Sequence, residues 1–386
     1  DALDGPAEEC DDGNADDEDA CHTDCTQARA TFVALGGNHT CALVDNGSVR
    51  CWGNGNNGRT GHADLLNIGD DEPASAAGVV DLGGPVQELT TGLSHTCARY
   101  GDGTVRCFGR ALEGQLGYGD TQAIGDDEPP SMAGLVPLGG PVQSVVSRGG
   151  SFHSCALRVD GQVRCWGHAG MGRLGVPGLA GNVGNDEPAD AIPPVSVGGV
   201  VVQLATGAEH SCARIDDGSV RCWGSNASGQ LGRGVAGSVG DDEDPSSVAA
   251  VSIGAPVTSI TAGFFHTCAL LEGGAVRCWG RGNNGRLGQG NTAWVGLANQ
   301  PSDVPDVDVG GVAVQIAAGN AHTCALLVGG TVRCWGWGAQ GQLGYGTLQD
   351  VGDDETPAFV GDVPVGAAVV QIAADGNHTC ALLDSG

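Results

Sequence analysis

One stretch of sequence decides the fold: residues 314–360, which read VQIAAGNAHTCALLVGGTVRCWGWGAQGQLGYGTLQDVGDDETPAFV. Close copies of this stretch recur along the whole chain. Its histidine falls at positions 39, 95, 153, 210, 266, 322 and 378, at intervals of 56, 58, 57, 56, 56 and 56 residues. The first half is present seven times and the second half six times, because the sequence reaches Gly386 inside the seventh copy. Such a regular period predicts an array of equivalent structural units.

Each copy is predicted to form antiparallel β structure. It opens with a short apolar segment rich in β-branched residues, such as VQELTT at 86–91, and this composition favours a strand. Two further segments follow, each carrying one cysteine. If Cys41 faces Cys51, the turn between them centres on Asn46, and the next residue is Gly47. Glycine takes this place in all six complete copies, as a tight hairpin with a left-handed position requires.

The cysteines are interpreted as structural. Opposed residues of an antiparallel pair lie within disulfide reach, and sixteen cysteines are rare in a reducing cytosol. Metal ligation is the alternative, but the chain has no C-x-x-C motif, which such sites favour. We therefore predict one disulfide in each hairpin: Cys41–Cys51, Cys97–Cys107, Cys155–Cys165, Cys212–Cys222, Cys268–Cys278 and Cys324–Cys334. Partners for Cys10, Cys21, Cys25 and Cys380 are not assigned.

The repeat length indicates the architecture. Three or four short strands in every ~40–60 residues are typical of propeller blades rather than of solenoids. We predict an all-β chain with a seven-bladed β-propeller at residues 30–386, its last blade incomplete. Residues 1–29 stand outside the period and are predicted to be a short, acidic, cysteine-rich module that is truncated.

The repeated motifs resemble those of the regulator of chromosome condensation repeat family. In the first copy they are G-x-x-H-T-C-A-L at 36–43, G-x-V-R-C-W-G at 47–53 and G-R-T-G at 58–61, and they recur in each later copy. The resemblance implies a seven-bladed propeller. The cysteine pairs, which intracellular members are not expected to carry, make the chain similar to the secreted bacterial branch. The EECDDGN segment at 8–14 resembles a cysteine-rich repeat of myxobacterial surface and secreted proteins.

The charge balance excludes several partners. There are 46 acidic residues against 17 basic ones, all arginine, for a net charge of −29. Such a chain repels phosphate backbones and anionic lipid, so neither nucleic-acid binding nor membrane insertion is expected. The nucleotide-exchange activity of the family, exerted beside chromatin, fits this composition poorly. A plant ultraviolet photoreceptor of the family uses Gly-Trp-Arg-His-Thr motifs, and no Trp-Arg precedes any histidine here.

Three residue types recur at fixed positions of the copies, with Phe108 in place of tryptophan in the second, and are interpreted as structural. The histidine ring is expected to bond to backbone within its own blade, and the tryptophan to fill the blade core. The arginine of the V-R-C motif is expected to pair with neighbouring loops. Histidines placed one to a blade lie too far apart to share a metal ion. No GxSxG, HExxH or phosphate-loop motif occurs, so we predict no enzyme and no catalytic residues.

Acidic loops are the candidate metal sites. Five copies carry a variant of Gly-Asp-Asp-Glu-Pro, and clustered carboxylates suit Ca²⁺; the alternative is a solvated turn that maintains solubility. No cofactor is required by this interpretation, but calcium is a candidate. The candidate ligands are Asp70, Asp71 and Glu72 in the first copy, and Asp11, Asp12, Asn14, Asp16, Asp17 and Asp19 in the N-terminal module.

The function predicted from these features is recognition. We expect a secreted or cell-surface module, without enzymatic activity, that binds a protein or a surface polysaccharide through one propeller face. Candidate partner-binding residues are those irregular among the copies: Trp294, Trp337 and Tyr345. The alternative is a self-assembling subunit of an extracellular filament, sheath or surface layer. An extracellular enzyme is the third hypothesis.

Overall fold

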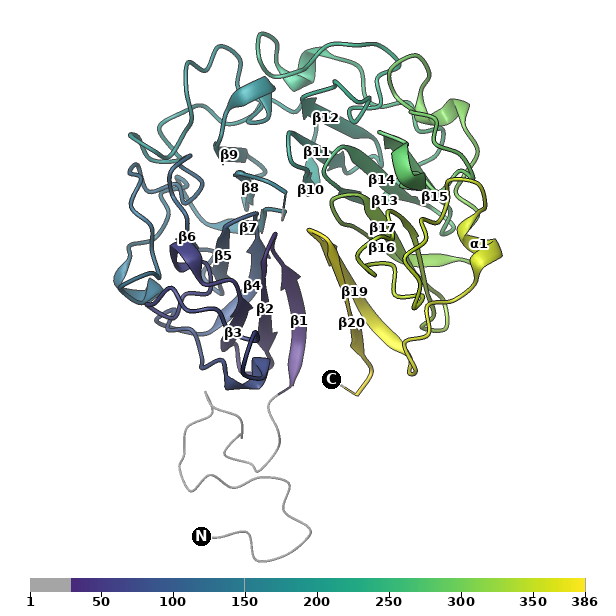
Figure 1. Ribbon diagram of the computed structural model, residues 1–386. Coiled ribbons are helices and arrows are strands. Elements are labelled where there is room, and N and C mark those ends of the chain that lie inside the picture. The colour runs from purple at the N-terminus through teal and green to yellow at the C-terminus, as the bar shows by residue number, and fades with distance from the viewer. Residues whose placement is uncertain (1–28, 149, 386) are drawn as a thin grey trace, which may run out of the picture.

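The computed structural model describes residues 29–148 and 150–385. Within them, seven antiparallel sheets are arranged as blades around a central opening (Figure 1). The innermost strands are β1 (Ala30–Leu35), β4 (Val86–Thr91), β7 (Val142–Val146), β10 (Val201–Thr206), β13 (Val257–Ala262), β16 (Ala313–Ala318) and β19 (Val369–Asp375). The predicted N-terminal module, with Cys10, Cys21, Cys25 and its candidate calcium ligands, lies outside the described residues.

Each innermost strand pairs with a second strand, and in six blades the second pairs with a third. The second strands are β2 (His39–Val44), β5 (His95–Tyr100), β8 (His153–Arg158), β11 (His210–Ile215), β14 (His266–Leu271), β17 (His322–Leu327) and β20 (His378–Leu383). The third strands are β3 (Val49–Gly53), β6 (Val105–Gly109), β9 (Val163–Gly167), β12 (Val220–Gly224), β15 (Val276–Gly280) and β18 (Val332–Gly336).

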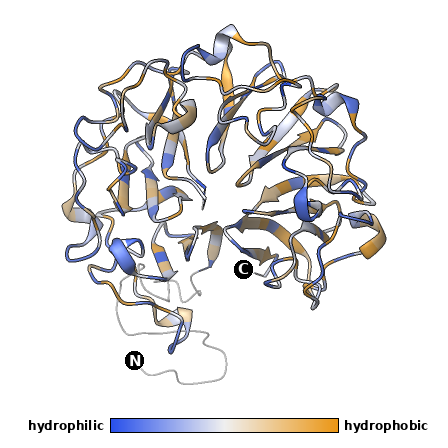
Figure 2. Cartoon of the chain, turned by 45° about the horizontal axis from the view of Figure 1, so that its top comes forward, coloured by the Kyte–Doolittle hydropathy of each residue, from blue (hydrophilic) through white to orange (hydrophobic). Residues whose placement is uncertain are grey.

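Long loops follow the third strands and cover the rim of the ring. Figure 2 shows hydrophobic residues along the strands and many hydrophilic ones in these peripheral loops. Their helices are α1 (Pro357–Val360) and the short 3₁₀ turns Asn56–Gly58, Ala74–Ala76, Pro130–Met132, Gly170–Gly172, Pro245–Ser247, Asn283–Gly285 and Pro301–Asp303.

The hairpin register confirms the prediction from the cysteine spacing. Cys41 lies directly opposite Cys51, and the Gly47 N–H donates to the Val44 carbonyl, 2.9 Å away. Gly47 has a φ of +85°, the left-handed value that the turn requires. All six predicted disulfides are present, with Cα–Cα distances of 4.0–4.1 Å.

The seventh blade has only the two strands β19 and β20. It lies beside β1, so the first and last blades meet at a seam (Figure 1). β20 is half-buried along its length, whereas β14 and β17 are fully buried, because a third strand covers the latter two. Cys380 in β20 is the one free cysteine of the described residues. In the part of the chain described, no helix is long and apolar enough to cross a membrane.

Candidate functional site

The repeated histidines join neighbouring blades, which corrects the expected bond to backbone within one blade. Each Nε2 lies close to a hydroxyl oxygen on the second strand of the next blade. The first six pairs, at 2.8–2.9 Å, are His39–Thr96, His95–Ser154, His153–Ser211, His210–Thr267, His266–Thr323 and His322–Thr379. The seventh, His378 with Thr40 at 3.3 Å, closes the ring across the seam.

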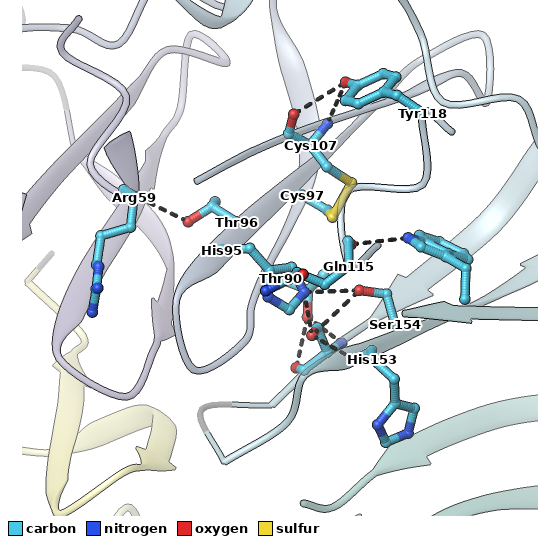
Figure 3. The surroundings of a disulfide bond; sticks show 12 residues. Arg59, Thr90, His95, Thr96, Cys97, Cys107, Gln115, Tyr118, His153 and Ser154 are labelled. Carbon is cyan, nitrogen blue, oxygen red and sulfur yellow. Dashed lines mark hydrogen bonds between the residues drawn. A yellow bond between two sulfur atoms is a disulfide. The ribbon is translucent and has the colours of Figure 1, made fainter. Parts of the chain in front are cut away.

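Five of the seven hydroxyls are fixed by a second bond, to a backbone carbonyl. Thr267 Oγ1 donates to the Gln230 carbonyl at 2.9 Å, and the Trp279 indole N–H donates to the same oxygen at 3.0 Å. The hydroxyl hydrogen is thereby used, so His210 Nε2–H must be the donor to Thr267. Figure 3 shows the corresponding network in the second blade, around the disulfide Cys97–Cys107.

This network requires neutral histidines. Complete burial, with a smaller contribution from Arg173, lowers the pKa of His210 to about 3. Burial likewise lowers the pKa of His95 to about 3. The other ring nitrogen, Nδ1, is buried without a hydrogen-bond partner in both residues. A second proton would thus have no acceptor, and the interpretation of these histidines as structural is consistent with the geometry.

The V-R-C arginines pair with loops, as expected. Arg333 Nε lies 2.7 Å from an Asp362 carboxylate oxygen, and Arg164 donates to the Ile192 carbonyl at 2.6 Å. Arg50 donates to the Ala77 carbonyl at 2.8 Å. These arginines hold the peripheral loops against the third strands.

A loop of the third blade crosses one end of the central opening. The innermost strands of all seven blades line a cavity of ≈ 260 Å³ there. Arg148, after β7, donates to Thr261 Oγ1 of the fifth blade at 2.7 Å and to the Ala374 carbonyl of the seventh blade at 3.1 Å. A Cβ on Gly150 would lie 2.9 Å from the Phe264 ring. The loop therefore braces the third blade against two distant blades.

Two groups of aromatic and arginine side chains flank this loop at the same end of the propeller, and we call them together the aromatic–arginine band. One group is Arg110 and Phe152, and the other is Phe264, Phe265, Arg281 and Trp294. The Phe264 and Phe265 rings meet edge to face with centroids 4.5 Å apart. Arg281 Cζ lies 5.6 Å from the Phe265 centroid and 5.8 Å from the Trp294 centroid. In the first group, Arg110 Cζ lies 5.3 Å from the Phe152 centroid. Cation–π contact explains these placements.

The three candidate residues are placed differently. Trp294 belongs to the band and is 41% exposed. Trp337 lies in the sixth blade and lines a large groove. The Tyr345 hydroxyl bonds to the backbone N and O of Cys334, as Tyr118 does to Cys107 in the second blade, so it anchors a loop. The other residues of the band were not predicted from the sequence. Two signals were available: the adjacent Phe264 and Phe265, and the interval of 58 residues between His95 and His153, which is longer than the others.

The acidic loops bring carboxylates together. In four loops the carboxylate oxygens lie within 4.8 Å of one another, and Asp70, Asp71 and Glu72 form one of these groups. In the second blade, burial and then the hydrogen bond and charge of Asp127 raise the pKa of Glu128 to about 7. A bound cation would stabilise the charged carboxylates and so oppose this shift.

Calcium binding at these loops remains a prediction. We expect millimolar Ca²⁺ to raise the unfolding temperature, because carboxylates of the folded loops bind it better than those of the unfolded chain. Thermal unfolding of the full chain with Ca²⁺ would measure this temperature, and calorimetric titration would measure the number of bound ions. Mg²⁺ is the control ion in both experiments. The variant D126N/D127N should lose one site from the stoichiometry. An unchanged stoichiometry in that variant would contradict a site in the loop.

The fold and these contacts define a class of protein: a disulfide-braced, seven-bladed propeller whose blades are joined by histidine–hydroxyl bonds. The RCC1-like domain family matches residues 9–386, and the chain belongs to that family. Among curated relatives it is 27% identical to the ultraviolet-B receptor UVR8 of Arabidopsis thaliana, over 96% of this chain and 78% of that protein.

Two solved structures show the same fold. Human WBSCR16 superposes with a TM-score of 0.72 and 20% identity, over 92% of this chain and 86% of that one. Prp20p of Saccharomyces cerevisiae gives the same score and identity, over 92% and 83% of the two chains. The propeller described here is therefore an RCC1-like propeller, with one disulfide in each of its first six blades.

Proposed function

We propose that this chain is a secreted or cell-surface binding module that recognises a partner protein without catalysis. The observation that carries the proposal is the aromatic–arginine band, which breaks the seven-fold pattern at one end. Arg281, which lies between the Phe265 and Trp294 rings, forms no ion pair among the described residues, and its Nε has no hydrogen-bond partner there. Trp294 is exposed and the other side chains of the band are half-buried. Aromatic and arginine side chains are the groups that most often dominate protein interfaces.

The relatives support a protein partner. Prp20p is described by its binding to Gsp1p and histones, and also in complex with Kap60. Six buried disulfides support a location outside the reducing cytosol. We assign the chain to a secreted, bacterial, disulfide-containing branch of the family, and its N-terminal segment to a cysteine-rich repeat of the kind found on myxobacterial surfaces. A surface polysaccharide is the other partner to be tested.

Binding of the labelled full chain to intact cells of its source would test this function. We expect saturable binding, with at least a tenfold weaker apparent affinity in R281A/W294A, because this variant loses the exposed aromatic side chain of the band and the arginine that contacts it. L65A/L66A alters exposed leucines of the first blade and serves as the control, with unchanged binding. Trypsin treatment of the cells should abolish binding and periodate should spare it. Equal binding by wild type and R281A/W294A would contradict a role for the band.

The repeated acidic loops favour a second candidate function, a subunit of an extracellular filament or layer. Carboxylates clustered on several blades are groups through which a bound Ca²⁺ could join protomers. Light scattering of the native protein, with Ca²⁺ and then with excess chelator, distinguishes the two functions. We expect a monomer in both conditions; a calcium-dependent polymer would support assembly and make the acidic loops its contacts.

A further inference from the structure

The sixth blade carries a groove that lies outside the aromatic–arginine band. It has a volume of ≈ 1190 Å³ and is bordered by the loop after β18 and by α1, at the right of Figure 1. We call it the blade-six groove and define it by Trp337, Leu348, Asp353, Asp354, Glu355 and Phe359. The Asn284 amide of the fifth blade donates to Asp350 Oδ2, 2.9 Å away, and this bond connects the groove to the neighbouring loop.

The two aromatic side chains of the groove, Trp337 and Phe359, are specific to this blade, whereas Leu348 has an exposed counterpart in Leu65 of the first blade. Phe359 is 83% exposed and Leu348 is 64% exposed. Phe359 stands seven residues after Gly352, the glycine that opens the acidic loop. At the same distance from the equivalent glycine, the other blades carry Ala76, Met132, Ala191, Ser247 and Asp303. In place of Trp337, counted from the end of the third strand, they carry Asn54, Arg110, His168, Ser225 and Arg281. Exposed large apolar groups gathered in one hollow are unusual on a surface without a partner.

The polar side chains of the groove are all acidic or neutral; no basic residue lines it. Asp353, Asp354 and Glu355 hold their oxygens within 4.8 Å of one another. Burial, followed by the hydrogen bond to Asp354, raises the pKa of Glu355. No arginine of the described chain forms an ion pair with these carboxylates.

We propose that the blade-six groove binds a segment of another polypeptide in which a lysine or arginine is flanked by apolar side chains. The cation would meet the three carboxylates, while its apolar neighbours pack on Trp337 and Phe359. This chain cannot supply such a segment from the same blade, because it has no lysine and its Arg333 is bound to Asp362. The net charge of −29 steers a cationic partner towards the surface.

Fluorescence anisotropy with labelled probe peptides tests the proposal on the full chain. The probe has a Leu-Lys-Leu core between Gly-Ser arms, and the control cores are Leu-Glu-Leu and Ser-Lys-Ser. We expect binding of the Leu-Lys-Leu probe alone, with Kd raised at least tenfold in D353N/D354N and in F359S. The matched control D126N/D127N alters the equivalent carboxylates of the second blade and should leave Kd unchanged.

Other outcomes would overturn the proposal. Phe359 is too exposed for F359S to unfold the blade, and circular dichroism would verify this, so an unchanged Kd in F359S contradicts an apolar subsite. A groove that binds only a cation would give one of two other results. Either the Ser-Lys-Ser probe would bind as tightly as the Leu-Lys-Leu probe, or millimolar Ca²⁺ would displace the Leu-Lys-Leu probe while F359S had no effect on its Kd. Because the probe replaces the native partner, this result is independent of the cell-binding experiment on R281A/W294A.

Discussion

Acidification from pH 6.5 to 5 is expected to unfold the propeller by separating its blades. Burial lowers the pKa of His39, His95, His210 and His322 to about 3, and that of His153 and His266 well below the usual value. A histidine whose folded pKa is depressed contributes stability above its unfolded pKa of ~6.5, and this stability is lost as the pH falls towards the folded value. Below pH 6.5 the histidines of the unfolded chain therefore bind protons, whereas those of the folded chain stay neutral.

The expected magnitude is large. Each fully buried histidine changes the free energy of unfolding by about 1.4 kcal/mol per pH unit below pH 6.5. Six of them together lose on the order of 12 kcal/mol by pH 5, which is comparable with the whole stability of a typical domain, ~5–15 kcal/mol. Urea unfolding between pH 8 and 5 would measure the slope.

Two glutamates act in the opposite direction. The pKa values of Glu128 and Glu187 are raised to about 7, so their contribution is present at low pH and is lost as the pH rises through about 7. Because the six histidines outweigh the two glutamates, we expect maximal stability at about pH 7–8. H210Q keeps a donor for Thr267 but does not titrate, and it should lower the proton uptake on unfolding by one. An uptake below two protons in the wild type would contradict the buried neutral ring.

Much of the blade could be predicted from the sequence because its signals are local. Cys41 and Cys51 lie ten residues apart around a turn glycine, so their spacing determined the hairpin register and the disulfide together. The V-R-C arginine was likewise expected to pair with loops, and Arg333 does so with Asp362. Repetition of these signals six times made the architecture predictable.

The contacts between blades could not be predicted in the same way. His95 and its partner Ser154 are 59 residues apart, and no local spacing connects them. The available signal was the serine or threonine that follows each of the seven repeated histidines, as Thr96 follows His95. Its hydroxyl oxygen bonds to the histidine of the preceding blade. The band and the blade-six groove also depend on tertiary proximity, which placed Arg281 beside Trp294 and Trp337 near Phe359.

Reduction of the disulfides is expected to prevent folding by a different route. Each disulfide closes a loop within one hairpin, with a sequence separation of 10, and should stabilise the protein by about 3 kcal/mol in the chain-entropy model. Six such bonds together contribute on the order of 18 kcal/mol, at least as much as a domain usually possesses. The protein refolded with reductant present should therefore remain unfolded by circular dichroism, whereas the oxidised protein refolds on dilution from urea.

Removal of a single disulfide tests whether the loss of folding comes from the missing cross-links rather than from a general disruption of the blades. C212A/C222A should fold, with a free energy of unfolding lower by about 3 kcal/mol, and its proton uptake at acid pH should stay unchanged because the histidine ring is intact. Acid treatment should conversely leave all six bonds formed, since they lie within blades and the histidines lie between them. Recovery of the native urea midpoint by the fully reduced chain would show that packing alone suffices, and that the disulfides stabilise the folded blades far less than their loop-closure entropy implies.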